Sequence, residues 1–128
     1  MIQLAHIALY VQDLEGMKDF YVQYFGATAN AKYHNPKTGL QTYFLSFSDG
    51  ARLELMTRPG LSPRQKDTLS AGYNHIAFAL GSRERVDALA QELSLAGCPV
   101  LRGPRVTGDG YYEVSLLDPE GNLLELVA

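Results

Sequence analysis

The sequence predicts an α+β protein built from two tandem β-α-β-β-β modules. Two short motifs each occur twice and in the same order: His-Ile-Ala at residues 6–8 and 75–77, and Gly-x-x-x-Glu-Leu at residues 50–55 and 121–126. The histidine and glutamate are 48 positions apart in the first copy and 50 in the second. Self-similarity at this scale indicates a duplicated supersecondary unit. We therefore expect a single domain over residues 1–128, with two curved mixed sheets, each backed by one helix.

The first module is predicted to occupy residues 1–57. An apolar run at 4–12 indicates a buried strand in which His6 is the unexpected polar residue. Asp13 can cap the helix that follows, and Gly26 is placed to end it. The apolar side chains of this helix recur at helical spacing and are Met17, Phe20, Tyr21, Tyr24 and Phe25. A strand near 27–33, a turn-rich loop at 33–39, and strands at 41–48 and 51–57 joined by a tight turn complete the module.

A polar linker is predicted over residues 58–72, with room for one helical turn, and the second module over 73–128. An apolar strand at 73–80 contains His75, and Ser82 can cap the next helix. The predicted buried stripe of that helix is Val86, Leu89, Ala90, Leu93 and Ala96. Strands near 99–103, 111–117 and 122–127 close the second copy.

Composition and charge exclude several classes of protein. The net charge is -3 with scattered basic residues, so a nucleic-acid footprint is not supported. No apolar run approaches the roughly 20 residues needed to cross a bilayer, and the N-terminus has no signal-peptide pattern. The glycines form neither G-x-G-x-x-G nor a P-loop, so nucleotide binding lacks a basis. Cys98 is the only cysteine and reads as a small buried hydrophobe in a reducing compartment, which predicts a cytoplasmic protein.

Four polar residues stand at matched positions of the two copies: His6, Glu54, His75 and Glu125. Because side chains alternate across a strand, each is expected on the face opposite the apolar side chains that pack on a helix. Two carboxylates brought together out of water resist double ionisation, and a divalent cation would neutralise both. The sequence thus predicts that the two sheets form a concave metal-binding cup. The alternative interpretation is two satisfied core histidines and two surface carboxylates.

The four candidate ligands indicate which metals could bind, and residues near them could contact a substrate. Two imidazole nitrogens and two carboxylates suit zinc, nickel, cobalt, manganese or iron(II), with open positions for water or substrate. Arg105 and Tyr112 flank a glycine-rich segment at 107–110 that could close over the site and touch an anionic substrate, or be an ordinary hairpin. Glu113 could face either way. His34 lies in the turn-rich loop, and the sequence allows two interpretations of it: a solvent-exposed loop residue or a substrate contact.

These motifs resemble the vicinal oxygen chelate superfamily, which includes glyoxalase I, fosfomycin-resistance thiol transferases, bleomycin-resistance proteins, methylmalonyl-CoA epimerase and extradiol dioxygenases. The resemblance covers essentially the whole chain, and Asp-Pro-x-Gly-Asn-x-x-Glu-Leu at residues 118–126 is its most specific motif. The His-Glu-His-Glu set is similar to that of lactoylglutathione lyase. Two positions depart from that enzyme: Tyr10 stands where an Arg usually contacts glutathione, and Arg58 where an Asn does.

The resemblance implies a metal-dependent lyase or isomerase that transfers a proton next to a carbonyl. The metal would bind two adjacent substrate oxygens and stabilise an enediolate, with Glu125 as general base and Glu54 able to share that role. The substrate would be a small molecule, with a thiol adduct among the candidates, contacted by Tyr10, Arg105 and Tyr112. Such proteins usually form homodimers, so the ligands could converge within one chain or between two.

Other functions remain open from the sequence. They are thiol transfer, epimerisation, ring cleavage by an iron(II) dioxygenase, and non-catalytic small-molecule binding of the resistance-protein type. In the last case Tyr10, Tyr43 and Tyr112 would line the cup.

Overall fold

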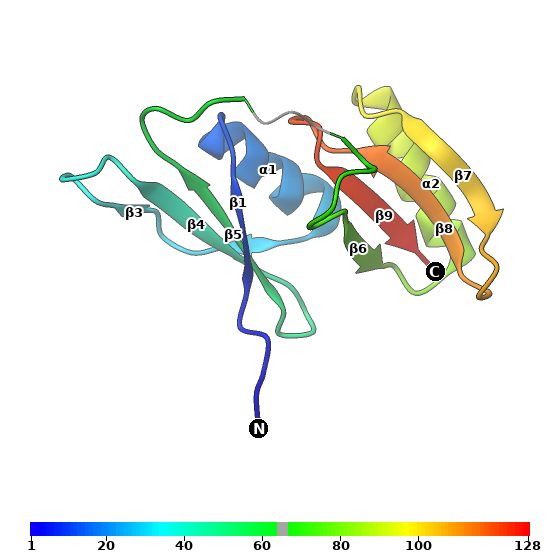
Figure 1. Ribbon diagram of the computed structural model, residues 1–128. Coiled ribbons are helices and arrows are strands. Elements are labelled where there is room, and N and C mark those ends of the chain that lie inside the picture. The colour runs from blue at the N-terminus through cyan, green and yellow to red at the C-terminus, as the bar shows by residue number, and fades with distance from the viewer. Residues whose placement is uncertain (64–66) are drawn as a thin grey trace. The chain divides into compact units, whose positions relative to one another are not determined.

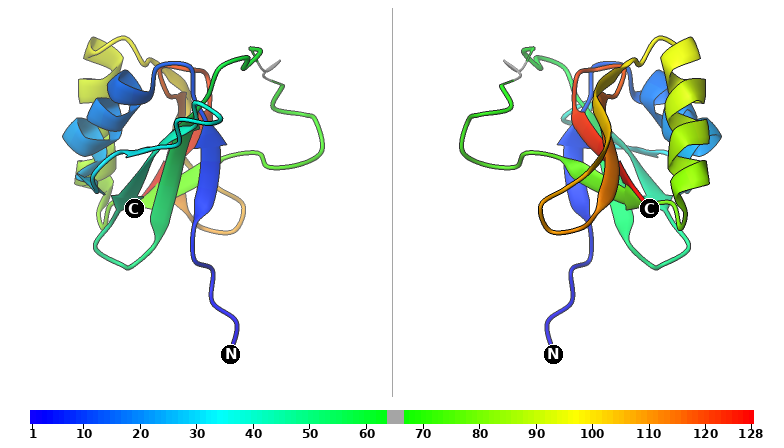
Figure 2. Two further views of the ribbon diagram at one scale, coloured as in Figure 1. Left: turned by 90° about the vertical axis from the view of Figure 1, so that its left-hand side faces the viewer. Right: turned by 90° about the vertical axis from the view of Figure 1, so that its right-hand side faces the viewer.

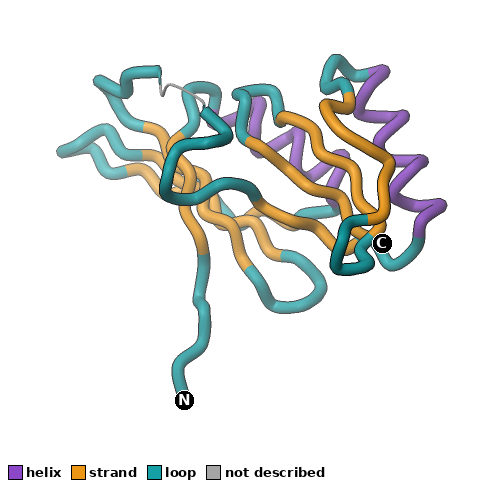
Figure 3. Tube along the Cα trace, turned by 45° about the vertical axis from the view of Figure 1, so that its right-hand side comes forward, coloured by secondary structure: helices purple, strands orange, loops and turns teal. Residues whose placement is uncertain are grey.

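The computed structural model describes residues 1–63 and 67–128. The chain divides into two compact units, which we call the first unit (residues 1–64) and the second unit (residues 65–128). Each contains one mixed sheet and one long helix, and in each the helix lies on one side of its own sheet (Figures 1, 2 and 3). The predicted α+β class with two mixed sheets and two helices is confirmed.

The first unit has the element order β1 (Ile7–Tyr10), α1 (Leu14–Phe25), β2 (Thr28–Ala29), β3 (Tyr33–His34), β4 (Gln41–Ser46) and β5 (Arg52–Thr57). Its strands are arranged β1-β5-β4-β2, and β3 also pairs with β4. β1 runs parallel to β5, and the other pairs are antiparallel. The histidine motif of β1 and the glutamate motif of β5 therefore lie on neighbouring strands.

Helix α1 begins and ends where the sequence predicts. The Asp13 carboxylate accepts a hydrogen bond of 3.0 Å from the backbone N–H of Gly16, which satisfies one free donor of the first turn. Gly26 adopts a φ of 67° at the C-terminal cap, a conformation that glycine takes without strain. The helix and the sheet bury one apolar core, whose members include Leu14, Met17, Phe20, Tyr21, Leu45, Leu53 and Leu55.

The second unit repeats this plan with β6 (Ile76–Ala79), α2 (Arg83–Leu95), β7 (Val100–Val106), β8 (Tyr112–Leu117) and β9 (Leu123–Val127). Its sheet order is β6-β9-β8-β7, with β6 parallel to β9. Ser82 caps α2 as predicted, through a 3.2 Å bond from the backbone N–H of Arg85. Of the predicted stripe, Val86, Ala90 and Leu93 are buried. Leu89 is half-buried, and Ala96 is exposed because it already lies at the C-terminal cap.

Several predicted boundaries were wrong. The strand expected over residues 4–12 is limited to Ile7–Tyr10, and that over 73–80 to Ile76–Ala79, so both histidines lie just before their strands. The region near 27–33 forms two short strands rather than one. β7 continues to Val106, past the predicted end at 103. Of the helical turn considered in the linker, residues 58–63 form no helix and residues 64–66 lie outside the described residues.

No helix in the described part of the chain is long and apolar enough to cross a membrane.

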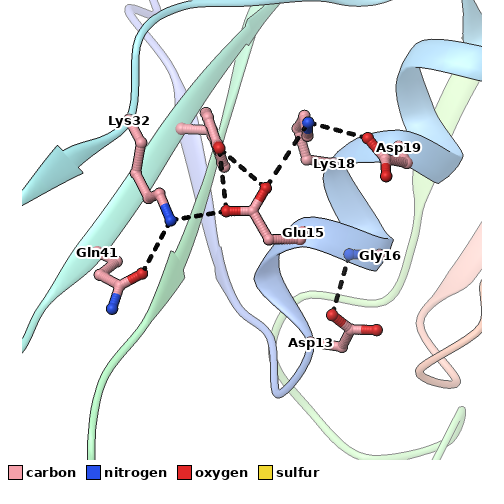
Figure 4. Close-up of polar contacts among 8 residues, drawn as sticks. Asp13, Glu15, Gly16, Lys18, Asp19, Lys32 and Gln41 are labelled. Atoms are coloured by element: carbon pink, nitrogen blue, oxygen red, sulfur yellow. Dashed lines mark hydrogen bonds and ion pairs between the residues drawn. The ribbon is translucent and has the colours of Figure 1, made fainter.

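A polar cluster ties α1 to the sheet of the first unit (Figure 4). The Glu15 carboxylate lies 2.8 Å from the Lys32 ammonium and accepts a 2.9 Å hydrogen bond from the Tyr43 hydroxyl. The Lys18 ammonium lies 3.7 Å from the same carboxylate and contacts Asp19 at 2.9 Å. The hydrogen bonds from Lys32 and then Tyr43 lower the pKa of Glu15 below its ordinary value.

We predict that Glu15→Gln makes stability less sensitive to acid. Because the folded-state pKa of Glu15 is lowered, its contribution is present above the ordinary value of 4.5 and is lost as the pH falls through the folded pKa. The free energy of unfolding of the variant should therefore be lower than wild type at neutral pH and fall less steeply below pH 4.5. Urea titrations at several pH values give the free energy of unfolding of each protein as a function of pH. If the curves of the variant and the wild type are parallel below pH 4.5, the prediction is contradicted.

Candidate metal centre

The first unit brings His6 and Glu54 together. Glu54 lies on β5 between the buried Leu53 and Leu55, so its side chain projects from the helix-free face of the sheet. Ala8 on β1 is its partner in the parallel register, and His6 lies two residues earlier. The imidazole Nε2 of His6 is 3.7 Å from Oε1 of Glu54. The sequence prediction that these two side chains share a face is confirmed.

The second unit repeats the pairing more tightly. Glu125 lies on β9 between the buried Leu124 and Leu126, opposite Ala77 of β6. The Nε2 atom of His75 is 3.2 Å from Oε2 of Glu125. In both units, therefore, the same strand pairing places a ring nitrogen beside a carboxylate.

His75 has an additional partner, Asn74, that orients its ring. Asn74 donates from its Nδ2 to the carbonyl of Thr68 at 2.9 Å, which leaves its Oδ1 as an acceptor. This Oδ1 lies 2.7 Å from Nδ1 of His75. Nδ1 therefore donates to Asn74, and Nε2 is the ring nitrogen that faces Glu125. Such a contact orients histidines that bind metals. Asn74 is a residue that the sequence analysis missed, although its place next to His75 was visible.

An aromatic side chain borders the pair in the first unit. Phe44 is the cross-strand partner of Glu54 on β4. The ring of His6 meets it edge-on at a centroid distance of 5.0 Å, and the guanidinium of Arg52 lies 4.7 Å over its centroid. The environment of His6 and Glu54 is therefore apolar on this side, with one cation at its edge.

A charged network borders the pair in the second unit. Ser115 of β8 is the cross-strand partner of Glu125, and Glu113 lies two residues earlier on the same face. An Nη2 atom of Arg105 is 2.9 Å from Oε1 of Glu113. Burial raises the pKa of Glu125, while the charge of His75 opposes the rise and Glu113 adds to it. The open question about Glu113 is thus answered: it faces the side of Glu125.

The three tyrosines expected to line the cup lie on different faces of their sheets. Tyr10 is half exposed on β1, on the side of Glu54. The Tyr112 hydroxyl bonds to Asp87 of α2, so its phenol lies on the helix side of the sheet, away from His75 and Glu125. Tyr43 likewise binds Glu15 of α1. The expectation that Tyr43 and Tyr112 line the cup was wrong, because the register turns both toward the helices.

The donor chemistry of the two pairs fits a borderline divalent metal. Each pair offers one imidazole nitrogen and one carboxylate, the donors preferred by zinc, nickel, cobalt, manganese and iron(II). Within residues 1–63 and 67–128, no group of three or more His, Cys, Asp or Glu side chains gathers as a metal site. One pair supplies only two ligands, so the predicted four-ligand centre needs a second pair, from the same chain or from another copy. Their convergence on one ion stays a prediction.

Known proteins are similar to this chain over nearly its whole length. The family model described as Glyoxalase/Bleomycin resistance protein/Dioxygenase superfamily matches residues 3–126. An uncharacterized protein of Pseudomonas aeruginosa is 36% identical over 125 residues, which cover 95% of this chain and 85% of the relative. A probable lactoylglutathione lyase of Vibrio cholerae is 28% identical over 98% of this chain and 89% of its own length.

A solved structure shows the same fold. The trypanothione-dependent glyoxalase I of Leishmania major superposes with a TM-score of 0.80 at 22% identity, covering 99% of this chain and 86% of that one. The family match spans nearly every residue of both units, including all four candidate ligands. The chain belongs to the glyoxalase/bleomycin resistance protein/dioxygenase superfamily.

Proposed function

We propose that this protein is a divalent-metal-dependent lyase or isomerase that moves a proton next to a carbonyl, similar to lactoylglutathione lyase. His6, Glu54, His75 and Glu125 would hold one metal ion per site. The observation that carries the proposal is the repeated pairing of a histidine Nε2 with a strand carboxylate, at 3.7 Å in one unit and 3.2 Å in the other. Two satisfied core histidines would not require carboxylates at matched positions in both copies.

Each residue has a part in this chemistry. A bound divalent cation would act as a Lewis acid on the substrate oxygens and lower the cost of removing the neighbouring proton. The Glu125 carboxylate would accept the proton from the substrate carbon and return it to the adjacent carbon, so that the reaction is an isomerisation. Glu54 offers a second carboxylate for the same transfer. Asn74 keeps Nε2 of His75 available as a ligand.

The substrate class follows from the resemblance to lactoylglutathione lyases. A hemithioacetal formed from a 2-oxoaldehyde and a thiol carries the two adjacent oxygens that this chemistry needs. Tyr10 and Arg58 replace the residues that usually contact glutathione, so the thiol is best tested with several candidates. By the same resemblance we propose a homodimer, and the buried Cys98 is compatible with the reducing conditions of the cytoplasm.

Metal addition is expected to stabilise the purified, metal-free protein. Nickel or zinc at about 100 times its dissociation constant should raise the free energy of unfolding by about 2.7 kcal/mol. Magnesium, which prefers oxygen ligands, is the control and should have a much smaller effect. The loaded protein is then assayed with methylglyoxal and glutathione, cysteine or other low-molecular-weight thiols. Absence of stabilisation by every transition metal would contradict the proposal and favour non-catalytic binding.

A further inference from the structure

The surroundings of the two His–Glu pairs are not equivalent, although the strands that carry them are. The cross-strand partner of the glutamate is Phe44 in the first unit and Ser115 in the second. Two residues earlier on the same strand, Thr42 occupies the position that corresponds to Glu113. At this position the second unit has an additional carboxylate on the face of its site glutamate, where the first unit has the hydroxyl of Thr42.

Glu113 is an expensive residue to hold in this place. Only 7% of it is exposed, and it shares a face of the sheet with another carboxylate, that of Glu125 on the neighbouring strand. A buried anion next to a second anion is unfavourable unless a cation compensates it. Arg105 provides that cation at 2.9 Å. A chain of interactions therefore runs from Arg105 through Glu113 and Glu125 to His75.

The backbone around Arg105 is arranged to bring it opposite Glu113. The β7–β8 register shifts between Arg102 and Arg105, after which Arg105 pairs with Glu113. Gly103 lies within this shift and has a φ of +92°. A Cβ added to it would lie 2.6 Å from the carbonyl oxygen of Glu113, so a residue with a side chain would not fit without movement of the strands. The buried Nε of Arg105 has no hydrogen-bond partner in the described part of the chain. The ion pair with Glu113 through Nη2 is thus the contact that orients the guanidinium.

We propose that Arg105 is a positioning residue that, through Glu113, holds the Glu125 carboxylate toward His75 and so strengthens metal binding by the second pair. The inference rests on the proposed function, because it concerns the same metal centre. It assigns to Arg105 a role different from the substrate contact suggested by the sequence. Without Arg105, the uncompensated Glu113 would repel Glu125 and turn it away from His75.

Nickel affinity of the full-length protein tests this proposal, measured at fixed pH by competition with a chelator. Arg105→Gln is expected to weaken nickel binding about 10- to 100-fold, the range typical of residues that support metal ligands. Arg105→Gln combined with Glu113→Gln should recover affinity to within about 3-fold of wild type, because the repelling charge is also removed. Arg83→Gln is the matched control. It removes one positive charge on the helix side of the same sheet, where Arg83 packs on Tyr112, and should leave affinity within about 3-fold of wild type.

The outcomes separate this inference from the proposed function. A wild-type protein that binds no nickel, zinc, cobalt or manganese overturns both. A wild type that binds nickel, together with an Arg105→Gln variant that binds equally or more tightly, overturns the inference alone. If Arg105→Gln does not fold, Arg105→Lys keeps the charge with fewer donors. A folded Arg105→Lys should lose less than about 10-fold in affinity, and the double variant should stay within about 3-fold of wild type. A loss of about 10-fold or more in Arg105→Lys, or a folded double variant that binds nickel more than about 10-fold more weakly than wild type, overturns the inference.

Discussion

Glu125→Gln is expected to lower the turnover of a methylglyoxal hemithioacetal by about 10²- to 10⁴-fold, the range typical of a lost general base. The amide that replaces the carboxylate has nearly the same shape, but it cannot accept a proton and binds a divalent cation less well. The measurement is the steady-state rate with metal present in excess of the wild-type requirement. Metal content is determined on the same samples, so that loss of the base is distinguished from loss of the ion.

Glu54→Gln is the matched variant for this experiment. It removes the corresponding carboxylate from the first unit, where Phe44 rather than Ser115 is the cross-strand partner. If Glu125 is the principal base, Glu54→Gln should retain more activity than Glu125→Gln at equal metal content. Wild-type turnover in Glu125→Gln would contradict its role, and equal losses in the two variants would show that the bases share the work.

Gly103→Ala is expected to destabilise the protein by about 3 kcal/mol. The positive φ of this residue costs a side chain about 1–2 kcal/mol, and an added Cβ would lie 2.6 Å from the backbone carbonyl oxygen of Glu113. Relieving that contact requires β7 and β8 to move apart, which typically adds a further 1–3 kcal/mol. Equilibrium urea unfolding of the metal-free protein measures the change without interference from ligand binding.

Gly110→Ala separates the two causes. Gly110 has the same φ of +92°, but an added Cβ would meet nothing within 4 Å. This variant should therefore show the conformational cost alone and remain clearly more stable than Gly103→Ala. Equal destabilisation of the two variants would show that the close approach to Glu113 does not contribute to the change in the free energy of unfolding.

The sequence was a good guide where local chemistry determines the structure. The helix bounds follow from Asp13, Gly26 and Ser82, each of which acts on backbone groups within one turn. The duplicated motifs correctly place each histidine beside a glutamate, because alternation along a strand determines the face of a side chain.

Features that depend on strand register were not accessible in the same way. Tyr43 and Tyr112 looked like residues of the open face, and only the pairing of β4 and β8 with their neighbours shows that they face the helices. Glu113 faces the side of Glu125 because it is two residues from Ser115, and Ser115 is the residue that pairs with Glu125. That pairing cannot be read from the sequence of β8 alone. The place of Arg105 depends on a register shift in β7, and a single sequence gives little warning of such an irregularity.

The different neighbours of the two glutamates have a consequence for how a gene duplication can diverge. Each copy has its own sheet, helix and apolar core, so a substitution at Thr42 or Phe44 can change one copy without altering the strand pairing of the other. Once the copies were joined in one chain, selection could act on them separately. The environment of one site glutamate can therefore change while that of the other stays as it is.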